Sequence, residues 1–214
     1  MISFDRIAPV YDKLALGVFG TSIREIQTDL LPLIPANAEV LIVGGGSGWI
    51  VEEIFEHGKI NRLVFLEASR EMLKLAVARE SPPALSIESA SKIEWVFSQH
   101  FNLLPTDRFQ VIIAPFFFDL FPQKGLSNIV KQLDTHLCQG GIWIFADFTL
   151  PKGILRPVAK FTLWLMYSFF NWTSGLKNHA LPNIPIIFEE MGYNLIQESK
   201  RFFTFMVAQA YEKS

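Results

Sequence analysis

The sequence has little cysteine and no excess of positive charge. Cys138 is the only cysteine among the 214 residues, which excludes a disulfide framework and a cysteine-based zinc cluster. A reducing, cytoplasmic location is expected on the same ground, and no metal site is predicted. The formal net charge of −2 and the pI of about 6.1 argue against nucleic-acid binding, because nucleic-acid-binding proteins usually carry a basic face.

Long apolar runs are also missing. Charged residues interrupt the first stretch of the chain, so it does not resemble a signal peptide. The longest apolar stretch near the end, Phe161–Trp172, has about half of the roughly 20 residues that a membrane-spanning helix needs. The mean hydropathy is nevertheless positive, at +0.28, with 20 Phe and 5 Trp. We therefore expect no transmembrane segment, and peripheral contact of Phe161–Trp172 with a membrane or a partner stays open.

The sequence does contain an alternation of short apolar runs with longer stretches in helical spacing. The apolar runs are nearly continuous, as strands buried on both faces of a parallel sheet require. Gly140 and Gly141 are interpreted as a turn before the fifth strand. The predicted strands are Val40–Val43, Leu63–Leu66, Ile93–Phe97, Val111–Ala114 and Ile142–Ala146, and the predicted helices among them are Phe4–Ile34, Trp49–His57, Ser69–Arg79 and Gly125–Leu137.

The C-terminal part has a different pattern. Phe161–Trp172 and Ile184–Met191 are helical in spacing, and the extended segments Asn194–Ser199 and Phe202–Ala210 are close enough to pair antiparallel. The pattern as a whole predicts a single α/β domain over residues 1–214, with a mostly parallel sheet, an antiparallel strand near the C-terminus and helices on both faces.

A glycine-rich loop, Gly44–Gly48, follows the first predicted strand and precedes a helical pattern. Glycines allow a tight turn and let a ligand approach the backbone, while the helix behind the loop offers free N–H groups. Glu67 follows the second strand, 19 residues after Gly48, where a carboxylate accepts hydrogen bonds from ribose hydroxyls. This order of strand, loop, helix, strand and acid predicts a cofactor that contains a nucleoside.

The spacing of the glycines disfavours two common cofactor loops. The dinucleotide fingerprint G-x-G-x-x-G would need glycine at Trp49, so a nicotinamide oxidoreductase is disfavoured. The Gly-Lys-Ser/Thr of a nucleotide-triphosphate loop is absent. A tight turn without a ligand stays open as the alternative.

Several segments together resemble the class I S-adenosylmethionine (SAM)-dependent methyltransferases. Val40–Gly48 resembles the first motif of this family, Glu67–Leu73 the segment after its second strand, and Gly140–Asp147 its Gly-Gly turn and fifth strand. The start Phe4–Asp12 is similar to the branch that methylates ubiquinone and menaquinone precursors. The resemblance covers nearly the whole chain. It implies a Rossmann-like seven-stranded sheet, an N-terminal helical cap over residues 1–36 and a helical insertion on the substrate side over residues 150–182.

The resemblance also implies roles for individual residues. The glycines would hold the methionine end of SAM, Glu67 would bind the ribose, Ala68 and Met72 would pack on the adenine, and Tyr11 would close over the cofactor. S-adenosylhomocysteine (SAH) would be the product. The complete predicted cofactor set is Tyr11, Gly44, Gly45, Gly46, Gly48, Glu67, Ala68, Met72, His100, Phe101, Ala114 and Pro115.

The predicted activity is methyl transfer to oxygen or carbon of a small or lipophilic, aromatic acceptor. Ligands of open α/β sheets lie at the carboxyl ends of the strands, which makes Asp119 and Asp147 candidate catalytic groups, with His179 from a flanking segment. Aromatic residues in two stretches would face the acceptor, namely Phe117, Phe118, Trp164 and Tyr167. The partner is expected to be this small molecule, and a homodimer stays open.

Three positions depart from the family pattern. Ile42 stands where the family usually has an acid, His100 (or Gln99, if the alignment slips by one) stands near the expected adenine contact, and Gln110 replaces an acid before the fourth strand. The alternative function is therefore a non-catalytic SAM-binding or scaffold protein that uses its aromatic surface for a partner.

Overall fold

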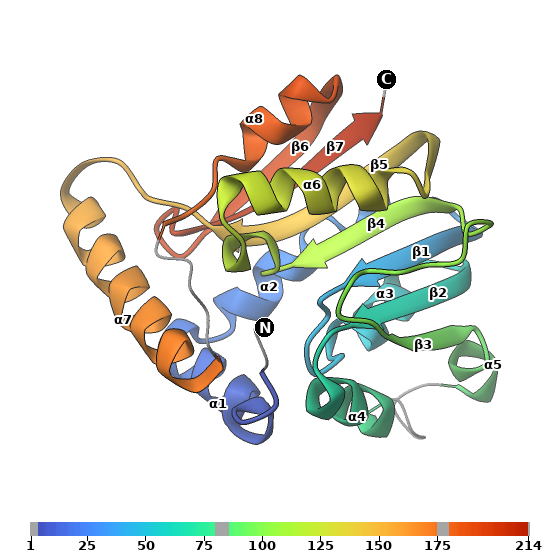
Figure 1. Ribbon diagram of the computed structural model, residues 1–214, viewed down its shortest axis with the longest axis horizontal. Helices are drawn as coiled ribbons and strands as arrows, with labels where there is room; N and C mark the ends of the chain where they lie inside the picture. The colour runs from blue at the N-terminus through green and yellow to red at the C-terminus, as the bar shows by residue number, and fades with distance from the viewer. Residues whose placement is uncertain (1–3, 80–85, 175–179, 214) are drawn as a thin grey trace.

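The computed structural model describes residues 4–79, 86–174 and 180–213, and it contains one seven-stranded sheet (Figure 1). The strand order is β3-β2-β1-β4-β5-β7-β6. In this sheet only β7 runs opposite to the direction of the other strands, which confirms the predicted mostly parallel sheet. The strands are β1 (Ala38–Val43), β2 (Ile60–Glu67), β3 (Ile93–Phe97), β4 (Phe109–Pro115), β5 (Leu137–Phe148), β6 (Tyr193–Arg201) and β7 (Met206–Lys213).

Helices cover both faces of the sheet (Figure 1). The α-helices are α1 (Ala8–Phe19), α2 (Ser22–Thr28), α3 (Ile50–His57), α4 (Arg70–Arg79), α5 (Ile87–Ala90), α6 (Gln123–Asp134), α7 (Arg156–Ser174) and α8 (Ile184–Glu190). Three short 3₁₀ turns are η1 (Leu31–Leu33), η2 (Phe118–Leu120) and η3 (Gly153–Leu155). No helix in the described ranges is long and apolar enough to cross a membrane.

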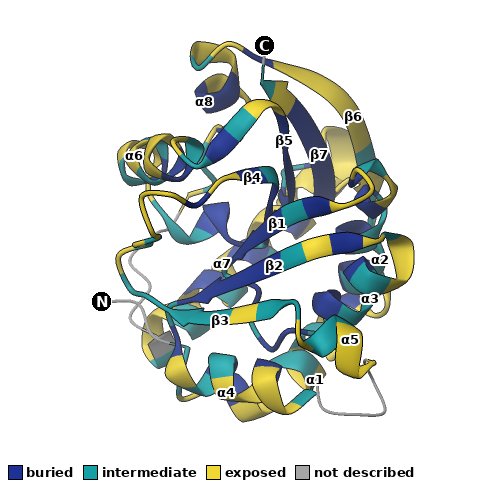
Figure 2. Ribbon diagram, turned by 90° about the vertical axis from the view of Figure 1, so that its right-hand side faces the viewer, coloured by how far each residue is buried: buried dark blue, intermediate teal, exposed yellow. Residues whose placement is uncertain are grey.

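Two apolar layers form because successive strand residues point to opposite faces. In β1, Val40 and Ile42 join the layer under α2, α3 and α7, whereas Leu41 and Val43 join the layer under α6 and α8. The central strands are accordingly almost fully buried (Figure 2). The continuous apolar runs in the sequence thus reflect burial on both faces.

The structure corrects several predicted boundaries. The N-terminal helix expected over Phe4–Ile34 is divided, because Gly20 has a φ of 60° and separates α1 from α2. Gly140 and Gly141 lie within β5, where the pairing with β4 has a register shift, so they do not form a separate turn. The strand expected to begin at Phe202 begins at Met206, because the residues before it form the turn from β6.

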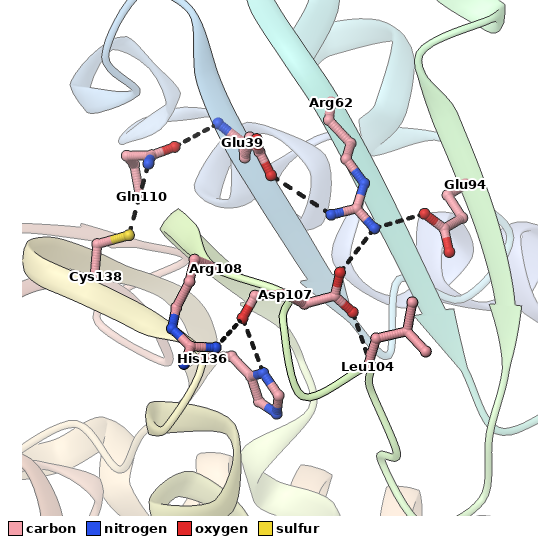
Figure 3. Close-up of polar contacts among 9 residues, drawn as sticks. All are labelled: Glu39, Arg62, Glu94, Leu104, Asp107, Arg108, Gln110, His136 and Cys138. Carbon is pink, nitrogen blue, oxygen red and sulfur yellow. Dashed lines mark hydrogen bonds and ion pairs between the residues drawn. The ribbon is translucent and has the colours of Figure 1, made fainter.

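Polar contacts join the amino ends of the parallel strands (Figure 3). The Arg62 guanidinium on β2 contacts the carboxylates of Glu39 at 3.5 Å, Glu94 at 2.6 Å and Asp107 at 2.9 Å. Gln110 accepts a hydrogen bond from the backbone N–H of Glu39 at 2.7 Å. Asp107 and Gln110 thus connect β4 to β1 and β2 at the amino ends of the strands, opposite to the glycine loop.

Candidate active site

A pocket lies where β1, β2 and β4 end and where α1 passes over them. Its floor is the glycine loop, and its walls come from the segments after β2, β3 and β4. The predicted cofactor residues that line it are Tyr11, Gly44, Gly45, Gly46, Glu67, Ala68, Met72, Phe101 and Pro115. The structure therefore brings most of the predicted set to one cavity.

Each glycine of the loop has a different spatial constraint. A Cβ on Gly44 would lie 2.5 Å from the Phe117 ring, and one on Gly48 would lie 2.6 Å from the Cβ of Ala76 in α4. A Cβ on Gly46, by contrast, would meet no atom within 4 Å, although its φ is +59°. Gly46 therefore leaves open space beside a backbone that a ligand can approach.

The Glu67 carboxylate lies at the end of β2 and is 7% exposed. Its Oε2 accepts a hydrogen bond from the N–H of Gly46 at 3.0 Å, and its Oε1 accepts from the N–H groups of Ala68 and Ser69, each at 2.9 Å. Burial raises the pKa of Glu67 to about 7, although the three N–H groups act against this shift. When ionised, the side chain only accepts hydrogen bonds, whereas the protonated form also carries one O–H donor.

The N-terminal segment is held over the pocket by two acidic residues. Asp12 accepts hydrogen bonds from the Ser47 hydroxyl at 2.7 and 2.8 Å and contacts the Arg79 guanidinium at 2.6 Å. Asp5 accepts from the Ser69 hydroxyl at 2.6 Å, at the start of α4. The sequence interpretation missed these contacts, and the only signal for them was the pair of acids in Phe4–Asp12.

Two phenylalanines in the pocket wall adopt an unusual backbone conformation. Phe101 has a φ of 55° and Phe116 a φ of 49°, which bulky side chains rarely adopt. Such conformations cost about 1–3 kcal/mol and cluster at functional sites. Both rings line the cavity together with Phe117 and Phe121, and the rings of Phe101 and Phe117 meet edge to face at 5.5 Å.

Several predicted residues lie outside this pocket. Phe118 is fully buried and packs on Trp143, Phe145 and Phe188, so its predicted place beside the acceptor is wrong. Three residues predicted to contact the cofactor also lie outside the pocket lining. Gly48 packs on α4, Ala114 is buried in the core, and His100 is exposed.

The positions that depart from the family pattern have distinct environments. Gln99 lines the pocket where His100 does not, which agrees with the alternative alignment. Ile42 is buried in the core and packs tightly against Gly45. A Cβ added to Gly45 would lie only 2.8 Å from the Ile42 Cγ2. An acid at this position would be surrounded by apolar groups.

The two acidic candidates lie under the turn after β4. Asp147 accepts hydrogen bonds from the N–H groups of Phe118 and Asp119 at 3.1 Å and of Phe148 at 2.8 Å. Burial raises the pKa of Asp147 to about 7, and burial with the charge of Asp147 raises the pKa of Asp119 well above its usual value. Asp147 thus orders the turn Phe116–Phe121, and neither carboxylate lines the pocket.

A second cavity lies beside α7. Leu163, Trp164 and Tyr167 line it from the helix, and Leu150 and Leu181 from the flanking segments. The buried Tyr167 hydroxyl has no hydrogen-bond partner in the described part of the chain, and burial together with the charges of Asp119 and Asp147 raises its pKa. Trp164 and Tyr167 therefore lie in this cavity and not in the first, and His179 lies outside the described residues.

No family model and no curated protein matches the sequence. Solved structures do match the fold. A putative methyltransferase from Haloferax volcanii, in complex with the Trm112 activator, has 13% identity and a TM-score of 0.72 over 99% of this chain and 98% of that chain. The N-methyltransferase NodS from Bradyrhizobium japonicum, bound to SAH, has 13% identity and a TM-score of 0.62 over 89% and 85%.

A third structure was solved with an aromatic molecule. The O-methyltransferase family 2 protein from Planctomyces limnophilus, in complex with apigenin, has 15% identity and a TM-score of 0.67 over 97% of this chain and 62% of that chain. These similarities, the strand order and the position of the glycine loop agree with each other. The chain therefore has the Rossmann-like fold of the class I SAM-dependent methyltransferases.

Proposed function

We propose that the chain is a SAM-dependent methyltransferase that acts on oxygen or carbon of a small or lipophilic, aromatic acceptor. The observation that carries this proposal is the hydrogen bond between Gly46 and the buried Glu67 at the carboxyl ends of β1 and β2. In this arrangement a ligand-accessible backbone and a ribose acceptor face the same cavity.

The residues present fit the cofactor. A carboxylate has about four lone-pair sites, and the N–H groups around Glu67 occupy three, so Oε2 retains one for a ribose hydroxyl. Met72 and Ala68 would contact the adenine, with Phe101 and Gln99 nearby, and Gly44–Gly46 would hold the methionine end. When bound, SAM supplies the reactive methyl group, so the chain mainly has to orient the reactants and exclude water.

Aromatic and aliphatic side chains dominate the rest of the pocket. Tyr11, Phe116, Phe117 and Phe121 line it from α1 and from the turn after β4. Burial and the charge of Asp119 raise the pKa of Tyr11, so its phenol stays protonated and can donate a hydrogen bond to an acceptor oxygen. These properties support an apolar, aromatic acceptor. The roles of Asp119, Asp147 and His179 as catalytic groups, and the ubiquinone-like branch, stay predictions.

Calorimetry with SAM, SAH and NADH tests the cofactor. We expect heat from SAM and SAH and none from NADH. Transfer of labelled methyl from SAM to a panel of phenols and quinols then tests the reaction. Absence of binding by both SAM and SAH would contradict the proposal.

The alternative is a SAM-binding protein without methyl transfer that uses an aromatic surface for a partner. Two observations favour keeping it: the acidic candidates do not line the pocket, and α7 presents exposed aromatic side chains. Binding of SAM without methylation of any acceptor would support this alternative.

A further inference from the structure

The outer side of α7 and the turn before it form an exposed apolar surface. The helix lies at one side of the molecule, beyond the carboxyl ends of the strands (Figure 1). It buries Ala159, Leu163 and Tyr167 on its inner side. We define the α7 surface as the exposed apolar side chains on the outer side, namely Ile154, Val158, Phe161, Trp164, Leu165 and Trp172. Their exposed fractions range from 48% at Leu165 to 92% at Ile154.

Positive charge borders this surface. Lys152, Arg156 and Lys160 are all exposed, and the sequence contains no Asp or Glu between Asp147 and Glu189. The absence of acid over this length contrasts with the net charge of −2 for the whole chain. At 3.6 residues per turn, Lys160 falls between the buried side of α7 and its exposed apolar side, whereas Arg156 is the exposed first residue of the helix and shares a stripe with Ala159 and Leu163. Long cationic side chains in that position can reach the headgroups while apolar neighbours enter the acyl boundary.

We propose that the α7 surface docks onto a lipid bilayer that contains anionic headgroups, with the helix lying along the interface. Exposed Trp and Phe supply the apolar contact, and tryptophan favours this depth of a membrane. The three cations supply the attraction to anionic lipid. The helix lies on the bilayer and does not cross it, as the absence of a spanning helix among the described residues requires.

The charge pattern favours lipid over a second copy of the chain. In a twofold contact through the α7 surface, the same segment of the second copy would offer no acidic side chain to pair with Arg156 and Lys160. The second cavity is next to the α7 surface. Trp164 and Trp172 of that surface, and Lys160 on its cationic border, also line the cavity, which would therefore face the bilayer. An apolar molecule dissolved in the bilayer could enter there. The inference does not depend on methyl transfer.

Vesicle flotation with the full chain tests the proposal. We compare vesicles of phosphatidylcholine alone with vesicles that also contain phosphatidylglycerol. We expect binding to the anionic vesicles, weaker binding at high salt and a shift of tryptophan emission to shorter wavelength. Two double variants should each weaken binding about tenfold or more. One combines Arg156→Glu with Lys160→Glu, and the other combines Trp164→Ser with Trp172→Ser.

Two controls match these variants elsewhere on the surface. Lys131→Glu reverses an exposed charge on α6, and Ile87→Ser removes a side chain that is 82% exposed on α5. Neither should change vesicle binding. Equal binding to both vesicle types, binding to neither, or a dimer that depends on Trp164 in the absence of lipid would overturn the proposal. Calorimetry with SAH on the same variants reports the cofactor pocket independently, so failure of either proposal can be recognised.

Discussion

The backbone N–H of Gly46 donates a hydrogen bond to Oε2 of Glu67 at 3.0 Å, which joins the glycine loop to the end of the neighbouring strand. This contact fixes the loop and the carboxylate relative to each other before any ligand binds. Because Glu67 is buried and its other oxygen accepts two further N–H groups, its position depends on backbone rather than on flexible side chains. The site is thus preorganised.

Alanine at Gly46 and at Gly48 should affect different properties. Both glycines have positive φ, so each substitution costs about 1–2 kcal/mol of backbone strain. At Gly48 the new Cβ would also lie 2.9 Å from the backbone of Ala76, which adds about 1–3 kcal/mol. We expect Gly48→Ala to lower the midpoint of urea unfolding more than Gly46→Ala does. We expect Gly46→Ala to lower SAH affinity about tenfold or more, because its Cβ enters the open space. The reverse order in both measurements would contradict this assignment.

Affinity for SAH should rise with pH through the pKa of Glu67. That pKa is about 7 because burial disfavours the charged form, and the ionised form is the one that accepts from ribose hydroxyls. Calorimetry should therefore show weaker binding below about pH 7 and a plateau above it. In Glu67→Gln we expect weaker binding that lacks this rise. A rise of the same size in this variant would assign the titration to another group.

The raised pKa of Glu67 has the opposite effect on the free energy of unfolding, which should fall as the pH rises. A raised folded-state pKa means that the folded chain holds the proton more tightly than the unfolded chain. The stabilising contribution of Glu67 is therefore complete below its ordinary pKa of 4.5 and is lost as the pH rises through about 7. Urea unfolding of the wild type and of Glu67→Gln across this range measures the contribution, and a wild-type stability that increases relative to the variant would be inconsistent with it.

Asp12→Asn should accelerate the release of SAH. The substitution removes the charge that Arg79 contacts at 2.6 Å while leaving an oxygen for the Ser47 hydroxyl. Because both charged groups are partly exposed, we expect the contact between α1 and the glycine loop to lose about 1 kcal/mol of free energy. If this contact must open before SAH leaves, dissociation becomes roughly fivefold faster. Stopped-flow measurement with excess SAM as competitor reports the rate. Glu71→Gln, which removes an exposed ion pair with Lys74 on α4, is the matched control and should leave the rate unchanged.

Phe118 and Phe121 should separate stability from acceptor choice. Phe118 is fully buried among aromatic rings, whereas Phe121 is half-buried and lines the pocket. We expect Phe118→Leu to cost about 1–2 kcal/mol of unfolding free energy with the same ranking of acceptors. We expect Phe121→Leu to change that ranking with a smaller loss of stability. A changed ranking in Phe118→Leu would restore the sequence-based prediction for that residue.

The positions of the central strands along the chain could be predicted because burial on both faces leaves a continuous apolar run in the sequence. Val40–Val43 and Ile142–Ala146 are continuous apolar runs, and both lie in the centre of the sheet. Two of the boundary errors arose at glycines, because the apolar pattern does not show which glycines interrupt an element. Gly140, with a φ of 69°, lies in an irregular part of β5 and does not end the strand, whereas Gly20 does separate two helices.

The cofactor side of the candidate site could be predicted from local spacing, since the glycine loop and Glu67 follow consecutive strands. The contacts of Asp12 could not. Its partners Ser47 and Arg79 are 35 and 67 residues away, and no local pattern specifies such pairs. Phe118 was misplaced because neighbouring phenylalanines in one turn point to opposite sides, which composition does not reveal.

The attachments of Asp5 and Asp12 have a kinetic consequence. Both acids bind groups at the floor and the rim of the pocket, so we expect a ligand beneath α1 to leave when these contacts open. Exit of the ligand and detachment of the N-terminal segment then share one barrier. The residence time of a bound nucleoside then becomes a measure of how firmly residues 4–19 are held, and release of the ligand can limit turnover in place of the chemical step.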